Sequence, residues 1–310
     1  MNRIIKVLVS ICFFCFITAH CLAADTGQDK SSGKADIISK LEIGFTANVL
    51  GDLDIRDARS AIVLWVEEIG QKIGFQVKGR IIEEMDTITK MINTGVLDLA
   101  VASVLDYLKV KEQINAEVFF GGIYENAKTK KYIVLVHSKD DAATIKDIKA
   151  GNLAITQQDS LGRLFLDTLL LRSRLQETDK FFASVIEKKK HSQAVLAVFF
   201  KRADICVVPD TVFDTMVELN PQIGKNLRII ASSQPMFDKI GLLRRDYNEN
   251  NKAPVIHSAL ELHKTSRGKQ VLMLFKMYRL TKINESDLDS VRALLDEYNR
   301  LKEDIEVQKR

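Results

Sequence analysis

The segment from Gly151 to Arg172 restricts the possible folds of this chain more than any other. A short apolar run, Leu153 to Ile155, predicts a buried strand that ends in the polar loop 156–159. Leucine or phenylalanine then occupies positions on almost every side of a helix, at 161, 164, 165, 166, 169, 170 and 171. This pattern predicts a helix that protein covers on most of its faces, with Asp159 or Ser160 as the N-cap.

A strand, a polar loop and a helix start bring free backbone N–H groups and the positive end of a helix dipole to one point. An anion can be bound at such a point without a lysine. The alternative interpretation is an ordinary capped helix of an α/β domain.

The N-terminal segment 1–23 has the pattern of a cleaved secretory signal peptide. Arg3 and Lys6 precede an apolar run over 7–18, and small residues follow at positions 23 and 24. An uncleaved membrane anchor is the weaker alternative, because the run is short for a bilayer and polar residues follow it directly.

A lipid anchor at Cys21 is disfavoured as well, since His20 stands where a lipobox requires a small residue. We therefore expect a soluble protein that loses 1–23 on export. The mature chain then begins with a flexible leader over 24–40, which is rich in Gly, Ser, Lys and Asp.

The composition is that of a soluble globular protein with one large or two medium domains: 310 residues, 46% hydrophobic and 28% charged. The formal net charge of +4 falls to +2 once Arg3 and Lys6 are removed, which is too small to predict a nucleic-acid partner. Removal of 1–23 also leaves Cys206 as the single cysteine of the mature chain. Its apolar surroundings, 205–208, predict a buried thiol in a strand without a disulfide.

Short apolar strands alternate with amphipathic helices along the chain. We expect strands at 41–45, 75–82, 97–102, 117–122, 131–136, 153–155, 181–186, 205–208, 227–231 and 240–243. We expect helices at 58–70, 85–93, 104–111, 145–149, 160–172, 192–201 and 211–219, a helical chain from 255 onward, and a long charged helix over 287–306. The alternation predicts an α/β fold of two lobes, each a mostly parallel sheet flanked by helices, with a ligand cleft between them.

Ligands in open α/β sheets bind beyond the carboxyl ends of the strands, so the loops after Phe45, Ala102, Ile155 and Val208 are the places to search. Hydroxyl, amide, imidazole and carboxylate side chains gather in these loops and at nearby helix starts, and they suit a small polar solute. The candidate binding residues are Thr46, Asn48, Ser103, Tyr107, Gln158, Asp159, Ser160, His191, Ser192, Asp210 and Thr211.

The motifs give no support to an enzyme. No Gly-x-Ser-x-Gly surrounds a serine, and Cys206 lies inside a predicted strand. The chain has no His-x-x-x-His, Cys-x-x-Cys, Gly-x-Gly-x-x-Gly or P-loop, so we predict neither a metal nor a cofactor. A convergent catalytic triad in the same cleft is the enzymatic alternative.

Five segments together carry a family resemblance in their order and spacing. They are Leu97-Asp98-Leu99-Ala100-Val101 followed by Tyr107, Asp159-Ser160-Leu161-Gly162, the run from His191 to Val198, Ala203-Asp204 with Asp210, and Ser232-Ser233-Gln234-Pro235. In these segments the chain, from Leu41 to the C-terminal helices, resembles the periplasmic substrate-binding proteins of phosphate and phosphonate ABC transporters.

The resemblance implies a type 2 periplasmic binding protein with a hinge between its lobes. Lobe 1 would comprise 41–125, lobe 2 would comprise 126–232, and 233–310 would return to lobe 1 and add the C-terminal helices. The protein would be periplasmic and would bind a small polar or anionic solute, by family analogy a phosphate- or phosphonate-like oxyanion. It would deliver this solute as a monomer to an ABC permease in the inner membrane. A sensory module that reports the ligand to a membrane receptor is the alternative within the same fold.

The family's roles carry over to individual positions. Ser160 and the neighbouring backbone N–H groups would hold an oxyanion and His191 would donate to it, while Asp210 would accept from the far end of the solute and Tyr107 would close the wall. Each of the last three has an alternative: a helix cap for His191, a core position for Tyr107 and an N-cap for Asp210.

Asp159 and Leu161 depart from the family's Ser-Thr-Ser-Gly loop and remove two hydroxyl donors. An ionised Asp159 that faces the cleft would repel a dianion, which argues against phosphate and for a weaker anion or a zwitterion.

Overall fold

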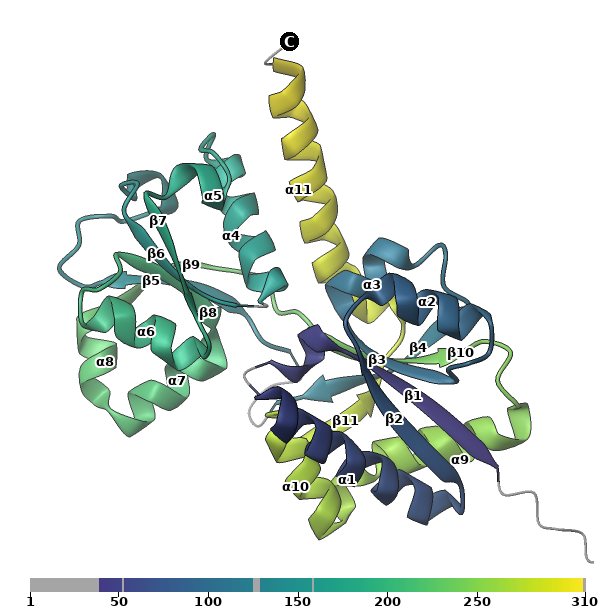
Figure 1. Cartoon of the computed structure of the whole chain (residues 1–310). Helices are drawn as coiled ribbons and strands as arrows, with labels where there is room; N and C mark the ends of the chain where they lie inside the picture. Colours follow the sequence, from purple (N-terminus) through teal and green to yellow (C-terminus); the bar gives the residue numbers. More distant parts are fainter. Residues whose placement is uncertain (1–38, 52, 125–128, 158, 309–310) are drawn as a thin grey trace, which may run out of the picture. The chain divides into compact units, whose positions relative to one another are not determined.

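The computed structural model describes residues 39–51, 53–124, 129–157 and 159–308, and Figure 1 shows its helices and strands. The predicted signal peptide 1–23 and nearly all of the predicted leader 24–40 lie outside the described residues. No helix in the described ranges has both the length and the apolar character that a membrane crossing requires.

Two sheets form the framework. The first has the strand order β11-β4-β10-β3-β1-β2, and the second has the order β7-β6-β8-β5-β9. The strands of the first sheet are β1 Lys40–Thr46, β2 Gln76–Ile82, β3 Leu99–Ser103, β4 Ala116–Ile123, β10 Lys239–Arg244 and β11 Arg279–Lys282. Those of the second are β5 Tyr132–His137, β6 Asn152–Thr156, β7 Ser184–Lys188, β8 Ile205–Pro209 and β9 Leu227–Ser232.

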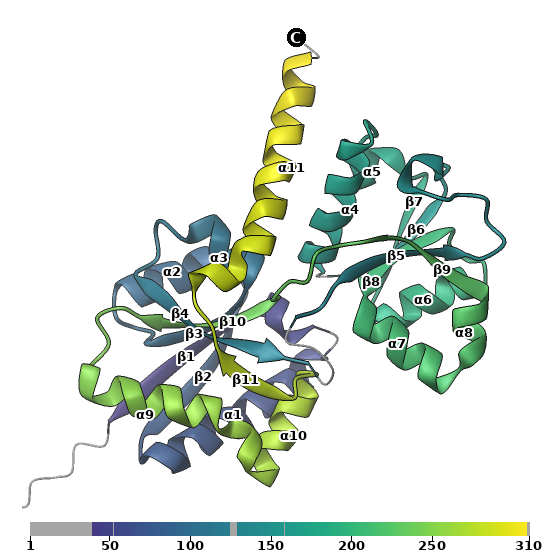
Figure 2. The ribbon, with the colours of Figure 1, turned by 180° about the vertical axis from the view of Figure 1, so that it is seen from behind.

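Helices cover both faces of each sheet, as Figures 1 and 2 show from opposite sides. On the first sheet, one face carries α1 Ile55–Ile73, α9 Glu249–Leu260 and α10 Ser266–Leu274, and the other carries α2 Met85–Asn93, α3 Val104–Val110 and the start of α11 Asp289–Gln308. On the second sheet, α4 Ser160–Arg172 covers one face, and α6 His191–Phe199, α7 Asp210–Leu219 and α8 Pro221–Asn226 cover the other. The two-lobed α/β class predicted from the sequence is confirmed.

The sheets are mixed, which corrects the expectation that each is mostly parallel. β1, β2 and β3 pair in parallel, but β10 runs antiparallel to both β3 and β4. In the second sheet β6 is parallel to β7 and β8, whereas β5 is antiparallel to β8 and β9. The alternation of strands and helices does not encode strand direction, and the strands at which the chain enters the second sheet and re-enters the first run against their neighbours.

Three local expectations are also wrong. The strand expected over 181–186 begins only at Ser184, because the short helix α5 Thr178–Phe181 precedes it. No helix is predicted over 221–226, but Pro221 begins α8 there, and Asn220 caps this helix by accepting from the Gln222 N–H at 3.1 Å. The chain beyond 255 is not entirely helical, since β11 forms the edge of the first sheet beside β4.

The chain passes from the first sheet to the second between β4 and β5, and it returns between β9 and β10. The two crossing segments pair with each other: the Lys130 N–H donates to the Met236 carbonyl at 3.1 Å, and the Met236 N–H donates to the Lys130 carbonyl at 2.9 Å. Near this bridge, the Ser233 N–H donates to the Tyr132 carbonyl at 2.8 Å. Ser232–Pro235, singled out from the sequence, therefore belongs to the returning crossing.

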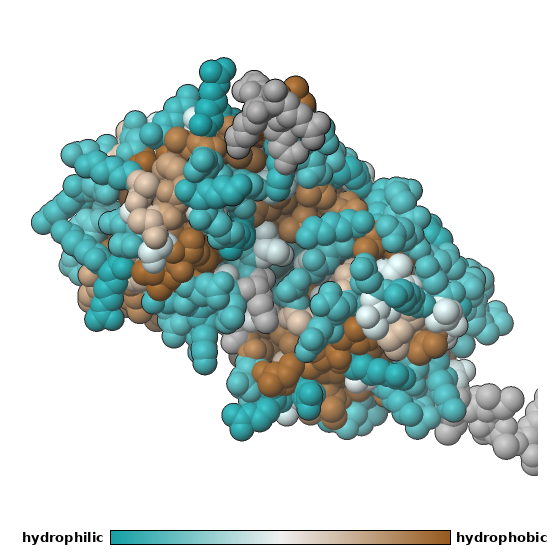
Figure 3. Space-filling view, turned by 45° about the horizontal axis from the view of Figure 1, so that its top comes forward, coloured by the Kyte–Doolittle hydropathy of each residue, from teal (hydrophilic) through white to brown (hydrophobic). Residues whose placement is uncertain are grey.

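Helix α11 contacts helices of both sheets. Leu288 and Val291, just before and within its first turn, are fully buried against the α3 side of the first sheet. Further along, Glu297 accepts two hydrogen bonds from the Arg172 guanidinium at the end of α4, at 2.9 and 2.8 Å. In Figure 3 charged and polar side chains cover much of the visible face, with apolar residues in separate patches, as expected for amphipathic helices whose apolar sides are buried.

The core of the first sheet is built around Trp65 of α1, which is 2% exposed. Its ring packs edge-on against Phe45 at 5.5 Å and against Phe275 at 5.1 Å between ring centroids. Trp65 therefore lies in the core, on the buried face of the helix predicted over 58–70. These contacts join strand β1 to α1 and to the end of α10.

Trp65→Ala should lower the free energy of unfolding by about 3–5 kcal/mol, because it removes this ring and leaves a cavity. Urea unfolding of the mature chain, followed by far-ultraviolet circular dichroism, measures the change. Val63→Ala on the same helix is the control, since Val63 is 51% exposed, and it should change stability by less than about 0.5 kcal/mol. Equal effects of the two substitutions would contradict this description of the core.

Candidate ligand-binding site

A small polar pocket lies where the start of α4 meets the start of α3 and the start of β10. It encloses about 320 Å³ of space, part of which is open to solvent. The lining residues are Asn48, Ser103, Leu105, Tyr132, Asp159, Ser160, Leu161, Asp238 and Lys239. They come from segments of both sheets, so neither sheet alone forms the pocket.

Strand register brings the residues of the first sheet together. Lys239 begins β10 and is the cross-strand partner of Ser103, the last residue of β3. Ser103 also caps α3, because its hydroxyl accepts from the Asp106 N–H at 3.0 Å. The Asn48 amide donates to the Asp106 carboxylate at 2.7 Å, which fixes the side chain of Asn48 at the edge of the pocket.

Asp159 organises the side of the pocket that belongs to the second sheet. As the N-cap of α4, its Oδ1 accepts from the Gly162 N–H at 3.1 Å and from the Tyr132 hydroxyl at 2.8 Å. Its Oδ2 lies 2.8 Å from Nε2 of His191, the first residue of α6. One carboxylate therefore joins the starts of two helices to strand β5.

The carboxyl of Asp159 is ionised at neutral pH despite its burial. Burial by itself raises the pKa of Asp159, but the hydrogen bond and charge of His191, the charge of Lys130 and the hydrogen bond from Tyr132 outweigh it and hold the pKa below its usual value. Gly162 makes the close approach possible, because a Cβ at this position would lie 2.6 Å from Asp159 Oδ2 and 2.9 Å from the Tyr132 ring.

A second buried carboxylate, Asp238, lies at the returning crossing. Its Oδ2 is 2.5 Å from Nζ of Lys130, and its Oδ1 accepts from the Tyr124 hydroxyl. Lys130 also lies 5.6 Å from the ring centroid of Tyr124 and 5.1 Å from that of Tyr132. Burial raises the pKa of Asp238, but the charges of Lys130 and Lys239 and the two hydrogen bonds hold it below its usual value.

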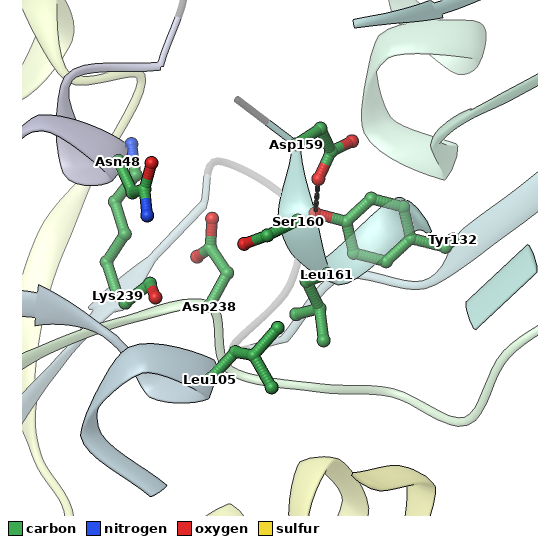
Figure 4. A pocket seen from close by; sticks show the side chains of 9 residues that line it. Asn48, Leu105, Tyr132, Asp159, Ser160, Leu161, Asp238 and Lys239 are labelled. Atoms are coloured by element: carbon green, nitrogen blue, oxygen red, sulfur yellow. Dashed lines mark hydrogen bonds between the residues drawn. The ribbon is translucent and has the colours of Figure 1, made fainter. Parts of the chain in front are cut away.

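The start of α4 offers the pocket its hydrogen-bond donors. The first backbone N–H groups of a helix have no acceptor within the helix, and here the Asp159 side chain accepts from that of Gly162. The Ser160 and Leu161 N–H groups therefore remain for a ligand. Figure 4 shows the Ser160 hydroxyl projecting into the pocket, and among the interactions of the described residues it has no partner.

Four of the candidate residues come together in this pocket: Asn48, Ser103, Asp159 and Ser160. Gln158 lies outside the described residues. The others do not line it. Thr46 is 1% exposed and its hydroxyl has no partner among the described residues. The half-buried residues Ser192 and Thr211 lie in the first turns of α6 and α7.

Tyr107 occupies the core position that was its alternative. It is 0% exposed, and its hydroxyl donates to Glu285, which precedes α11. Leu105 lines the pocket instead, because two residues along a helix rotate a side chain by about 200°. Tyr107 therefore faces away from the wall it was expected to close.

His191 and Asp210 also differ from their expected placement. His191 does not line the pocket itself but contacts Asp159, which does. Asp210 is the first residue of α7, not its N-cap, and its carboxylate accepts from the Thr211 N–H at 2.9 Å and the Lys131 N–H at 3.1 Å. His191 thus holds the side chain of Asp159, and Asp210 holds the backbone at Lys131 and Thr211.

Sequence reasoning missed Leu105, Tyr132, Leu161, Asp238 and Lys239 as lining residues. Asp238 and Lys239 follow the crossing segment 232–235 by only a few positions, so extending that segment to the next strand would have found them. Tyr132 had no comparable signal, because it begins a strand and only apolar residues follow it there. Within the described part of the chain, no group of three or more His, Cys, Asp or Glu side chains is placed to hold a metal ion.

Residues 53–288 match the family described as "ABC transporter, phosphonate, periplasmic substrate-binding protein". No match was found among curated proteins.

Several solved structures share the fold. A binding protein component of an ABC phosphonate transporter from Pseudomonas aeruginosa has a TM-score of 0.62 at 14% identity, over 86% of this chain and 88% of that one. PhnD1 from Prochlorococcus marinus, in complex with methylphosphonate, has a TM-score of 0.62 at 17% identity, over 84% and 98%. The aliphatic sulphonate binding protein SsuA from Escherichia coli has a TM-score of 0.51 at 13% identity, over 86% and 87%.

The hydrogen bonds of Asp159 lead to a pH-dependent prediction. Because the pKa of Asp159 is lower in the folded than in the unfolded chain, its ionised form stabilises the fold at neutral pH, and this contribution is lost as the pH falls through the folded-state pKa. Asp159→Asn should be less stable than the wild type by about 1–3 kcal/mol at neutral pH. The difference should shrink as the pH falls below about 4.

Urea unfolding at a series of pH values measures this difference. Asp141→Asn is the control, since Asp141 is exposed in the loop after β5 and should have little effect at any pH. A stability difference for Asp159→Asn that stays constant into the acid range would show that the ionised carboxylate does not stabilise the fold.

Proposed function

The chain belongs to the family of periplasmic substrate-binding proteins of phosphonate ABC transporters, and from this premise we propose that the pocket at the start of α4 binds a small phosphonate- or sulfonate-type oxyanion. The bound solute is delivered to an ABC permease in the inner membrane, and no chemistry takes place in the pocket. The protein acts in the periplasm, as a monomer, after loss of 1–23.

The observation that carries this proposal is the start of α4. A 13-residue helix points its N-terminus at the pocket, with the Ser160 hydroxyl and the Ser160 and Leu161 N–H groups at its end. The partial positive charge of a helix N-terminus favours an anion, and converging N–H groups supply its hydrogen bonds. Of the structures with the same fold, that of PhnD1 is in complex with methylphosphonate, and SsuA is described as an aliphatic sulphonate binding protein.

The remaining lining residues have distinct roles in this proposal. Lys239 and Ser103, paired across β10 and β3, hold the oxyanion from the side of the first sheet. Leu105 and Leu161, which face each other in Figure 4, contact the organic group of the ligand. His191 acts by positioning Asp159, and through it the start of α4.

Neither the sensory nor the enzymatic alternative has support comparable to that for transport. The family consists of substrate-binding proteins of transporters, and we identify no feature of the described residues that favours sensing or catalysis over transport.

Ser160→Ala should weaken binding of methylphosphonate or methanesulfonate about 10- to 100-fold, because a hydrogen bond to a charged group contributes about 1.5–3 kcal/mol. Thermal-shift screening of the mature protein against methylphosphonate, methanesulfonate, phosphate and sulfate identifies a ligand, and isothermal titration calorimetry then compares the variants.

The control for this prediction is Ser173→Ala, the same change at the opposite end of α4, where Ser173 is the C-cap. It should leave affinity unchanged. Equal affinity of Ser160→Ala and the wild type would mean that the oxyanion does not bind at the start of α4.

A further inference from the structure

We propose that this pocket selects ligands with a single negative charge and discriminates against dianions. The inference rests on the function proposed above and specifies the charge of the ligand at the same site. It follows from the charged groups around the pocket, which are compatible with one negative charge on the ligand but repel a second.

Two carboxylates line the pocket, Asp159 and Asp238. Each is buried, with side-chain exposures of 6% and 13%, so water screens their charges weakly. Each also has its own cationic or imidazole partner: Asp159 faces His191 at 2.8 Å, and Asp238 faces Lys130 at 2.5 Å. His191 and Lys130 therefore interact with the carboxylates of the protein and do not offset a charge on the ligand.

Asp238 lies close to the proposed oxyanion position. Figure 4 shows the Asp238 carboxylate and the Ser160 hydroxyl projecting into the same space. An oxyanion that accepts from Ser160 therefore faces Asp238. Among the described residues that line the pocket Lys239 is the one cation, and its charge already acts on Asp238.

The other titratable groups around the pocket do not add a spare positive charge. The Tyr132 and Tyr124 hydroxyls are neutral donors to Asp159 and Asp238, and burial, the largest cause, raises the pKa of both tyrosines well above the usual value. Asp106 adds a third carboxylate behind Asn48.

A monoanion is thus matched by the helix N-terminus, the hydroxyls and Lys239, whereas the second charge of a dianion is not. A sulfonate carries one negative charge throughout the accessible pH range. A phosphonate gains its second charge by an ionisation near neutral pH, comparable to the second pKa of about 6 for a phosphoryl group. The same site should therefore bind methanesulfonate at any pH, and methylphosphonate as its monoanion.

Calorimetric titration of the wild-type mature protein with both ligands, from about pH 5 to about pH 9, tests this inference. Methanesulfonate is the internal reference, because a change of charge on the protein affects both ligands, while only methylphosphonate changes its own charge. We expect the affinity ratio of methylphosphonate to methanesulfonate to fall by about tenfold or more from acid to alkaline pH.

A ratio that stays constant, or that rises with pH, would overturn the inference. If neither ligand binds at any pH, the proposed function itself fails, and this result is distinct from the loss of charge selection.

Asp238→Asn tests whether the Asp238 carboxylate causes the discrimination against dianions. This variant should raise the methylphosphonate to methanesulfonate affinity ratio at alkaline pH by about tenfold, because the carboxylate that opposes the second charge is gone. Asp141→Asn is the matched control: it removes the same charge at an exposed site near the other end of β5, and it should leave the ratio unchanged. An unchanged ratio in folded Asp238→Asn contradicts the assignment. If the variant does not fold because Lys130 has lost its partner, the wild-type pH series decides alone.

Discussion

The pocket depends on the buried carboxylate of Asp159 and on the three donors around it. A buried charge without partners is costly, and here the Gly162 N–H, the Tyr132 hydroxyl and His191 provide them. Since these donors belong to α4, β5 and α6, satisfying one charge also sets the position of three elements. The Ser160 and Leu161 N–H groups are left for a ligand because Asp159 has turned toward the protein.

A buried charge and its partner also hold together the two segments that cross between the sheets. Lys130 belongs to the outgoing crossing and Asp238 to the returning one, and their ion pair is buried beside the pairing of Lys130 with Met236. Breaking such a pair from one side leaves an uncompensated charge, so the two crossings are held to one arrangement. Asp238 also lines the pocket, and the residues that join the crossings thereby contribute to the electrostatics of the ligand site.

The role of Asp159 in the structure differs from the role that the sequence predicted for it. An aspartate in place of a hydroxyl donor predicted direct repulsion of a dianion. In the structure its carboxylate accepts from three donors, and Asp238, which no sequence pattern placed nearby, faces the proposed oxyanion position instead. The expectation that the site disfavours a dianion remains, but a different residue becomes its main cause.

Local sequence patterns were sufficient to predict most of the helices and strands and the resemblance to the family. Periodicity located most strands and helices, and the apolar faces of α4 and the placement of Trp65 followed from local patterns. Asp159 was identified as a possible N-cap because a cap depends on its own helix alone. Strand directions and the partners of side chains were decided only by the tertiary structure. Tyr107 could be either a wall or a core residue until the rotation of α3 was known, and Lys239 entered the pocket through its register with Ser103. Local patterns show which side of a helix or strand is buried and which is exposed to water. Contacts between residues over a hundred positions apart depend instead on how the sheets are assembled.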